Sequence, residues 1–336
     1  MLDYTTLKEL VEIDSPTGFT HHANDYIVKV LKSYNVQTKR TNKNVVKCKF
    51  SEQPTLGIAA HVDTLGGIIS EITSKGKIRI SKIGGLSLTG FEGGYCKIYT
   101  LEDTIYTGTF LLDNPATHVN RNVDKTQRTL SNMHIRLDEN VRTKAEVKQL
   151  GIQVGDFVCF DTNYQELPSG FIKSRFMDNK AGCFVLFELA KRLQALDKPV
   201  PVELFFSNYE EVGHGGTCGY SDSIQELLVI DMGVVGEHKN GLETACSICV
   251  KDGSGPYDYA MKKKLIQLAK QTNIPFELDV YDYYSSDGSA AMRAGNDYRV
   301  ALIGPGVSAS HGVERTHKQG IEATIDLCMA YIEDSF

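Results

Sequence analysis

Four short apolar segments of this sequence lead into side chains that can bind a metal ion. The segments 56–60, 202–206, 228–230 and 300–303 are followed, respectively, by His61 and Asp63, by Glu210 and Glu211, by Asp231 and, after a glycine-rich loop, by His311. Another acid, Asp178, stands at the start of a long helical pattern. Each residue alone has an ordinary structural explanation, but two histidines and several carboxylates together are typical ligands for a pair of divalent cations.

Glu210 and Glu211 stand side by side in the run SNYEEVGHGG. Adjacent carboxylates repel each other unless a positive charge lies close to them. Two divalent cations bring four positive charges, which three carboxylate ligands and one hydroxide would cancel. One of the two glutamates can therefore bind a metal ion, while the other is left for a different task.

Helical and strand-like patterns alternate in residues 1–66 and again in residues 171–336. Short apolar strands lie between segments in which apolar residues recur at helical spacing, the clearest of them at 179–196. This alternation predicts an α/β domain whose mainly parallel sheet is flanked by helices. Ligands bind such sheets at the carboxyl ends of the strands, which is where the candidate metal ligands fall.

Residues 67–170 have a different pattern, in which short alternating strands are separated by Gly, Asn and Asp. This pattern predicts a small β-barrel or β-sandwich inserted into the α/β domain. Two histidines in this segment, His118 and His134, have no acids at metal-ligand spacing and are interpreted as structural.

Composition argues against several classes of partner. The chain has 336 residues, of which 41% are hydrophobic, and its net charge of -6 argues against nucleic acid. No apolar run approaches the roughly 18 residues of a membrane span, and the first residues do not resemble a signal peptide. The eight cysteines stand mostly in apolar surroundings. They are interpreted as free thiols of a cytoplasmic protein.

The sequence as a whole resembles the cobalt- or zinc-dependent aminopeptidases that include the glutamyl, deblocking and tetrahedral aminopeptidases, some of which have been labelled endoglucanases. The resemblance covers nearly the whole chain. It rests on the order and spacing of the stretches AAHVDTLG, GGIISEITSKGKIRISKIGG, LGIQVGDFV, RFMDNKAG, SNYEEVGHGG, VIDMG and SHGVERTH. The α/β domain would then be of the zinc-peptidase type.

The resemblance implies a role for each candidate residue. One metal ion would be bound by His61 and Asp231, the other by Glu211 and His311, and Asp178 would bridge the two. Asp63 would orient His61, and Glu210 would be the general base. The stretch SSDGSAAMRAG resembles a family stretch that reads Gly-Gly-Thr-Asp-Ala, which implies a substrate-binding role for Asp287.

The implied reaction is removal of the N-terminal residue from a peptide by a water molecule that two metal ions activate. Zinc or cobalt is expected, and a set of histidines and carboxylates also accepts manganese. The resemblance further implies a homo-oligomer, up to a dodecamer, in which the inserted β domain mediates assembly and helps to enclose the active site.

Several alternatives remain at this point. A metal-dependent deacylase or carboxypeptidase would share the metal ligands but would bind a substrate carboxylate through an arginine, with Arg175, Arg293 and Arg315 as candidates. A glycosidase would need two unliganded carboxylates, and a structural or interaction protein would have lost a metal ligand. His214 and His317 lie close enough in sequence to compete as ligands.

Overall fold

The computed structural model describes residues 2–196 and 198–335, which form two compact units. The larger unit comprises residues 1–64 and 163–336, and the smaller unit comprises residues 65–162. The chain returns to the larger unit at Asn163, earlier than the predicted residue 171. The reason is that β10 (Gln165–Glu166) and β11 (Phe171–Ser174) pair with each other, and β11 pairs with β19 (Glu314–His317) of the larger unit.

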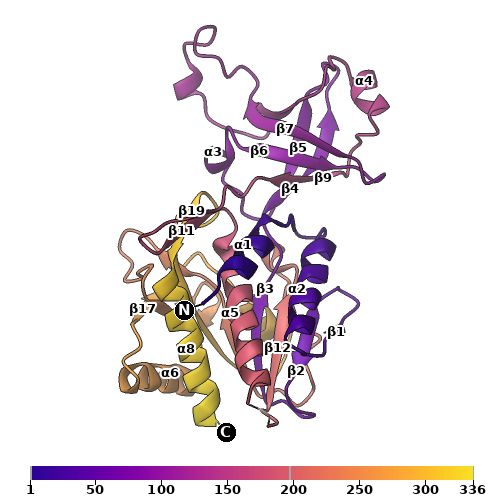
Figure 1. Ribbon diagram of the computed structural model, residues 1–336. Helices are drawn as coiled ribbons and strands as arrows, with labels where there is room; N and C mark the ends of the chain where they lie inside the picture. The colour runs from indigo at the N-terminus through magenta and orange to yellow at the C-terminus, as the bar shows by residue number, and fades with distance from the viewer. Residues whose placement is uncertain (1, 197, 336) are drawn as a thin grey trace. The chain divides into compact units, whose positions relative to one another are not determined.

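The described residues of the larger unit form a 13-stranded mixed sheet with a parallel centre (Figure 1). The central strands are β12 (Val202–Ser207), β3 (Leu56–His61), β13 (Glu226–Ile230) and β18 (Arg299–Ser308). Neighbours among them pair in parallel, with Ser207 opposite His61. The carboxyl ends of these strands therefore meet at one edge, as the sequence predicted.

The remaining strands of this sheet extend it beyond the parallel centre. On the β12 side lie β2 (Val46–Lys49) and β1 (Lys39–Arg40), which are antiparallel to their neighbours. On the β18 side, pairing continues to β14 (Gly233–Val235), β15 (Cys246–Asp252), β16 (Gly255–Pro256) and β17 (Phe276–Val280). The fold class is thus α/β, as predicted, with the parallel strands at the centre of a mixed sheet.

Helices cover both faces of the sheet because alternate strand residues point to opposite sides. Leu204 and Phe206 pack into the larger core, whereas Phe205 between them packs into the core of the other face. The larger core is built with α1 (Thr5–Glu12), α2 (His21–Ser33), α5 (Met177–Gln194), α6 (Tyr259–Gln271) and α8 (Lys318–Ser335) (Figure 1). The opposite face is covered by α7 (Asp287–Arg293) and by loops.

The smaller unit is a closed barrel, which decides between the two predicted architectures. Its strands follow the order β4 (Gly66–Ile72), β5 (Ile78–Ile83), β8 (Met133–Leu137), β7 (Ile105–Leu112), β6 (Tyr95–Tyr99) and β9 (Phe157–Phe160). Buried Phe91, Phe110 and Phe160 pack edge to face in its interior. The short helices α3 (Leu88–Phe91), η1 (Val123–Lys125) and α4 (Lys144–Gln149) complete the unit.

None of the helices in the described part of the chain combines enough apolar residues with enough length to span a bilayer.

Candidate metal centre

His61 is the last residue of β3 and is almost completely buried. Its Nδ1 lies 2.9 Å from the backbone carbonyl oxygen of Asp63, so this carbonyl holds the ring and leaves Nε2 directed away from it. The carboxylate of Asp63 lies farther from Nδ1, at 3.6 Å. The sequence predicted that the carboxylate of Asp63 orients His61. The shorter contact to the His61 ring comes instead from the backbone carbonyl of Asp63.

The carboxylate of Asp63 has its hydrogen-bond partners elsewhere. It accepts the backbone N–H of Glu210 at 3.2 Å and that of Glu211 at 3.3 Å. These glutamates lie in η2 (Glu210–Val212), which is flanked by Tyr209 and Gly213, both with positive φ. We call Tyr209–Gly213 the glutamate turn. The left-handed backbone at Tyr209 and Gly213 turns the chain sharply on both sides of the two glutamates, so that their carboxylates face different neighbours.

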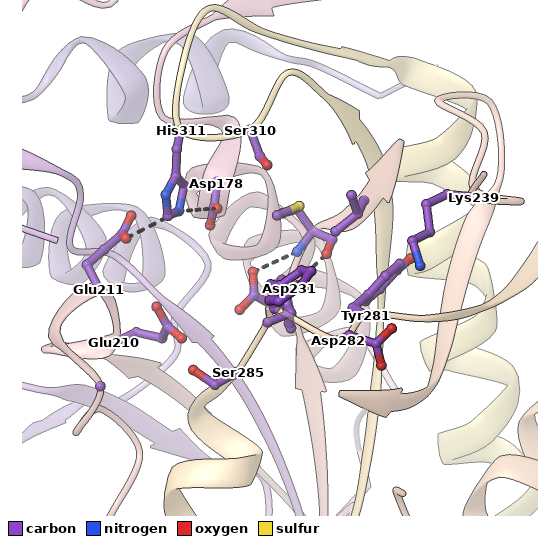
Figure 2. A pocket seen from close by; sticks show the side chains of 15 residues that line it. Asp178, Glu210, Glu211, Asp231, Lys239, Tyr281, Asp282, Ser285, Ser310 and His311 are labelled. Atoms are coloured by element: carbon purple, nitrogen blue, oxygen red, sulfur yellow. Dashed lines mark hydrogen bonds and ion pairs between the residues drawn. The ribbon is translucent and has the colours of Figure 1, made fainter. Parts of the chain in front are cut away.

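Asp178 lies between the two candidate histidines. Its Oδ1 is 3.2 Å from Nε2 of His61, and its Oδ2 is 3.5 Å from Nε2 of His311. Residues 178 and 179 have non-helical backbone angles at the start of α5, and their peptide bond is cis. Figure 2 shows Asp178 beside His311, with Glu211 on the other side of the imidazole.

The five predicted ligands form two groups that share Asp178. One group contains His61, Asp178 and Asp231, and the other contains Asp178, Glu211 and His311. Within each group the ligand atoms lie within 4.8 Å of one another. Glu210 belongs to neither group, although its Oε2 lies 3.7 Å from Nε2 of His61.

Glu314 supports this centre, and the sequence reasoning gave it no role. Its Oε2 accepts the backbone N–H of Asp178 and its Oε1 accepts that of His311, both at 3.0 Å. One buried carboxylate thus fixes the main chain of two candidate ligands. The signal in the sequence was an acid three residues after His311 in SHGVERTH, a spacing at which a side chain can return to the local backbone.

Burial makes it costly in free energy to keep the acids of the centre ionised side by side. Burial, partly opposed by His61 and reinforced by Asp231, raises the pKa of Glu210, and burial together with Asp178 raises that of Glu211. Burial and Asp178 raise the pKa of Asp231 to about 7. Burial lowers the pKa of His61, but the surrounding carboxylates outweigh it and raise this pKa.

The donor set fits divalent metal ions. Glu211 Oε1 is buried and has no hydrogen-bond partner among the described residues, as expected of an oxygen that is kept for a cation. Histidine nitrogen and carboxylate oxygen are ligands that zinc and related metals accept. Cations bound between these acids would also keep them ionised at neutral pH.

A cavity of about 550 Å³ opens beside the two groups. Figure 2 shows its wall running from Glu211 and His311 past Asp231 to Tyr281, Asp282 and Lys239. Asp287 does not line this cavity: it is buried at the start of α7 and accepts a hydrogen bond from Ser207. The structure therefore gives no support to the expected substrate contact of Asp287.

Other residues considered from the sequence lie outside the two groups. His214 stacks on Tyr209, and Nε2 of His317 lies 3.0 Å from the carbonyl oxygen of Ser169. Arg293 contacts Ser254, and Arg315 pairs with Glu243. The described lining of the cavity contains none of Arg175, Arg293 and Arg315.

The comparison with known protein families shows to which family the chain belongs. The model of the M42 glutamyl aminopeptidase family matches residues 43–327, which include every member of the two groups. The chain belongs to the M42 glutamyl aminopeptidase family. It is a metal-dependent aminopeptidase, and the alternatives of a deacylase and a carboxypeptidase are not favoured.

Individual proteins are similar to this chain over nearly its whole length. YhfE of Bacillus subtilis strain 168 is 42% identical over 332 residues, which cover 97% of this chain and 96% of YhfE. Lysyl aminopeptidase of Pyrococcus furiosus is 20% identical over 99% of this chain and 98% of its own. The structure of the TET1 peptidase of Pyrococcus horikoshii, 22% identical, covers 97% of this chain and 98% of that one with a TM-score of 0.87. That peptidase can assemble into a tetrahedron or a large octahedral shell.

Proposed function

We propose that each of the two residue groups binds one divalent cation and that Asp178 bridges the pair. The observation that carries this proposal is the position of the Asp178 carboxylate, whose two oxygens face different histidines. His61 and Asp231 would complete one site, and Glu211 and His311 the other. Zinc, cobalt and manganese all suit these ligands.

Glu210 is the general base and acid of the reaction. Bound cations would polarise the scissile carbonyl and make a water molecule acidic enough to lose a proton near neutral pH. Glu210 Oε2, which lies on the His61 side of the centre, receives that proton and later returns it to the nitrogen of the leaving amine. Burial raises the pKa of this carboxyl group, which makes it a stronger base for accepting the proton.

The other residues hold this constellation in place. Asp63 fixes the backbone of the glutamate turn, and Glu314 fixes that of Asp178 and His311. The cavity beside the centre accommodates the first side chain of a peptide whose N-terminus is free.

The assembled enzyme is proposed to be a cytoplasmic homo-oligomer, up to a dodecamer. Support comes from the assemblies of the Pyrococcus horikoshii TET1 peptidase. The larger unit, residues 1–64 and 163–336, would carry catalysis. The β-barrel would mediate assembly and help to enclose the active site.

The direct test is an assay of the purified, metal-depleted protein with chromogenic aminoacyl substrates before and after addition of zinc, cobalt or manganese. We expect activity to return with added metal and metal analysis to find two ions per chain. Activity on N-acetylated substrates should be absent. Full activity without metal, or preference for the acetylated substrates, would contradict the proposal.

A further inference from the structure

A short segment near the N-terminus is attached to the chain immediately after His61. Pro16 forms an isolated parallel bridge with Thr64, and the N–H of Thr17 donates to the carbonyl oxygen of Thr64 at 3.2 Å. The N–H of Thr64 donates to the carbonyl oxygen of Ser15 at 2.9 Å, and Ser15 Oγ donates to the carbonyl oxygen of Val62, also at 2.9 Å. Two main-chain hydrogen bonds and one from the Ser15 hydroxyl thus connect the segment to residues 62–64.

Thr17 adds a contact that the bridge itself does not require. Its Oγ1 donates to Oδ2 of Asp63 at 2.6 Å, and both residues are buried. Oδ2 also accepts the N–H of Glu211, while Oδ1 accepts the N–H of Glu210. The hydroxyl makes the shortest of these three hydrogen bonds to the carboxylate. A short hydrogen bond to an ionised acceptor is stronger than one between neutral groups.

We propose that Thr17 is a positioning residue of the reaction, which acts through Asp63 on the glutamate turn. The inference rests on the proposed role of Glu210 as the base. Thr17 fixes one oxygen of the Asp63 carboxylate, and this carboxylate fixes the two backbone N–H groups that carry Glu210 and Glu211. Small displacements of a reacting group reduce the rate of reaction strongly, so the hydroxyl affects kcat without contacting the substrate.

The test compares three variants of the full-length enzyme. Thr17→Val removes the hydroxyl and keeps the branched shape, whereas Thr17→Ser keeps the hydroxyl. Ser15→Ala removes a side-chain hydrogen bond of the same bridge that does not involve Asp63. For each variant we would measure kcat and KM on one aminoacyl substrate, metal content, and thermal unfolding of the metal-free protein.

We expect Thr17→Val to lower kcat by about tenfold, equivalent to a change of roughly 1.4 kcal/mol in the activation barrier. Its KM and metal content should stay close to those of the parent enzyme. Thr17→Ser should have a kcat close to that of the parent enzyme. Ser15→Ala should also keep the parent kcat, even if it lowers the unfolding temperature as much as Thr17→Val does.

Three results would overturn the inference. The first is an unchanged kcat in Thr17→Val. The second is a decrease of kcat in Thr17→Ser as large as that in Thr17→Val. The third is a decrease of kcat in Ser15→Ala that, relative to its decrease in unfolding temperature, is as large as that in Thr17→Val. If Thr17→Val failed to fold, Thr17→Ala would take its place under the same criteria, because it also removes the hydroxyl and leaves the main-chain bridge intact. None of these results bears on the metal dependence of the activity or on whether Glu210 itself is the base, so a failure here is distinct from a failure of the proposed function.

Discussion

The carboxylate of Asp63 accepts the backbone N–H of Glu210 at 3.2 Å. The two residues are 147 positions apart, and the contact uses the side chain of Asp63 and the main chain of Glu210. The side chain of Glu210 takes no part in this contact. It can be replaced without removing the hydrogen bond that holds the glutamate turn.

Replacement of Glu210 by Gln tests the division of labour between the two glutamates. The amide keeps the size of the side chain but cannot accept a proton, so we expect kcat to fall by a factor on the order of 10² or more. Both metal ions should remain bound, as measured by metal analysis of the purified variant. Loss of one ion from Glu210→Gln would mean that the roles of Glu210 and Glu211 are reversed.

Replacement of Asp178 by Ala should reduce metal content more than any other single change at the centre. Asp178 belongs to both groups, and without it two cations would repel each other across a short gap. The matched comparison is Asp231→Ala, which affects one group only and should spare the ion between Glu211 and His311. Two ions per chain in purified Asp178→Ala would disprove the bridging role.

Lys239 is expected to influence which N-terminal residue is removed. Among the described residues that line the cavity it is the one lysine, and its side chain is largely shielded from solvent. Its Nζ lies 4.0 Å from Oδ1 of Asp279, which is not part of the cavity lining. Asp282 of the cavity wall is more exposed and pairs with Lys251 at 3.2 Å. Lys239→Met should lower kcat/KM for an N-terminal Glu relative to Leu by about tenfold, because a partly buried cation attracts a carboxylate.

The control for Lys239 is Asp282→Asn, which removes a charge at the same cavity. This variant should leave the Glu-to-Leu ratio of kcat/KM unchanged or raise it. A Glu-to-Leu ratio that does not respond to Lys239→Met would show that the substrate side chain binds elsewhere.

The β-barrel should become less stable in mild acid because of His134. Burial and the nearby Lys77 lower the pKa of His134 to about 4, compared with about 6.5 in an unfolded chain. Between these values the unfolded state binds a proton that the folded state does not, so the free energy of unfolding falls as the pH is lowered from about 6.5 to about 4.

Asp113, the acid beside His134, does not titrate in the same range. Burial raises its pKa, but hydrogen bonds from Arg79 and Lys77 outweigh burial and lower the pKa to about 2. Hydrogen exchange of the β7 and β8 amides, corrected for intrinsic rates, would measure the effect. His134→Gln should flatten the pH dependence, and an unchanged slope would assign it to another group.

Removal of the barrel tests the separation of catalysis from assembly. Deletion of residues 65–162 with a short flexible linker should leave a folded larger unit, because the cost of loop closure varies slowly with length. Every candidate ligand lies outside the deletion, so two metal ions should still bind. Activity on peptides should fall sharply, and the protein should be monomeric by light scattering.

The matched variant for this experiment lacks residues 68–170, the approximate bounds that the sequence predicted. This longer deletion also removes β10 and its connection to β11, and β11 pairs with the strand that begins at Glu314. We expect the variant to bind metal more weakly than the one with the shorter deletion. Full peptidase activity in a monomer of either deletion variant would contradict the proposed role of the barrel.

Much of the candidate centre could be predicted from the sequence. The carboxyl ends of neighbouring parallel strands meet at one edge of a sheet, so the residues after each apolar segment had to converge. This local rule indicated His61, Asp231, His311 and the pair Glu210 and Glu211 as candidates. The resemblance to the aminopeptidases then singled out Glu211 and added Asp178, which completes the five residues that the structure brings into two groups. A change from helical to alternating periodicity, which can be read within a short window, indicated the inserted β unit.

The supporting contacts could not be predicted in the same way. They depend on which buried backbone groups need partners, and this is decided by packing. In this way Asp63 holds the glutamate turn, and Glu314 holds Asp178 and His311. Packing likewise places Asp287 outside the cavity. The position of the second domain boundary depends on the pairing of β11 with β19. The sequence determined which chemical groups reach the sheet edge, whereas only tertiary packing decided how buried acids and N–H groups are matched across long stretches of chain.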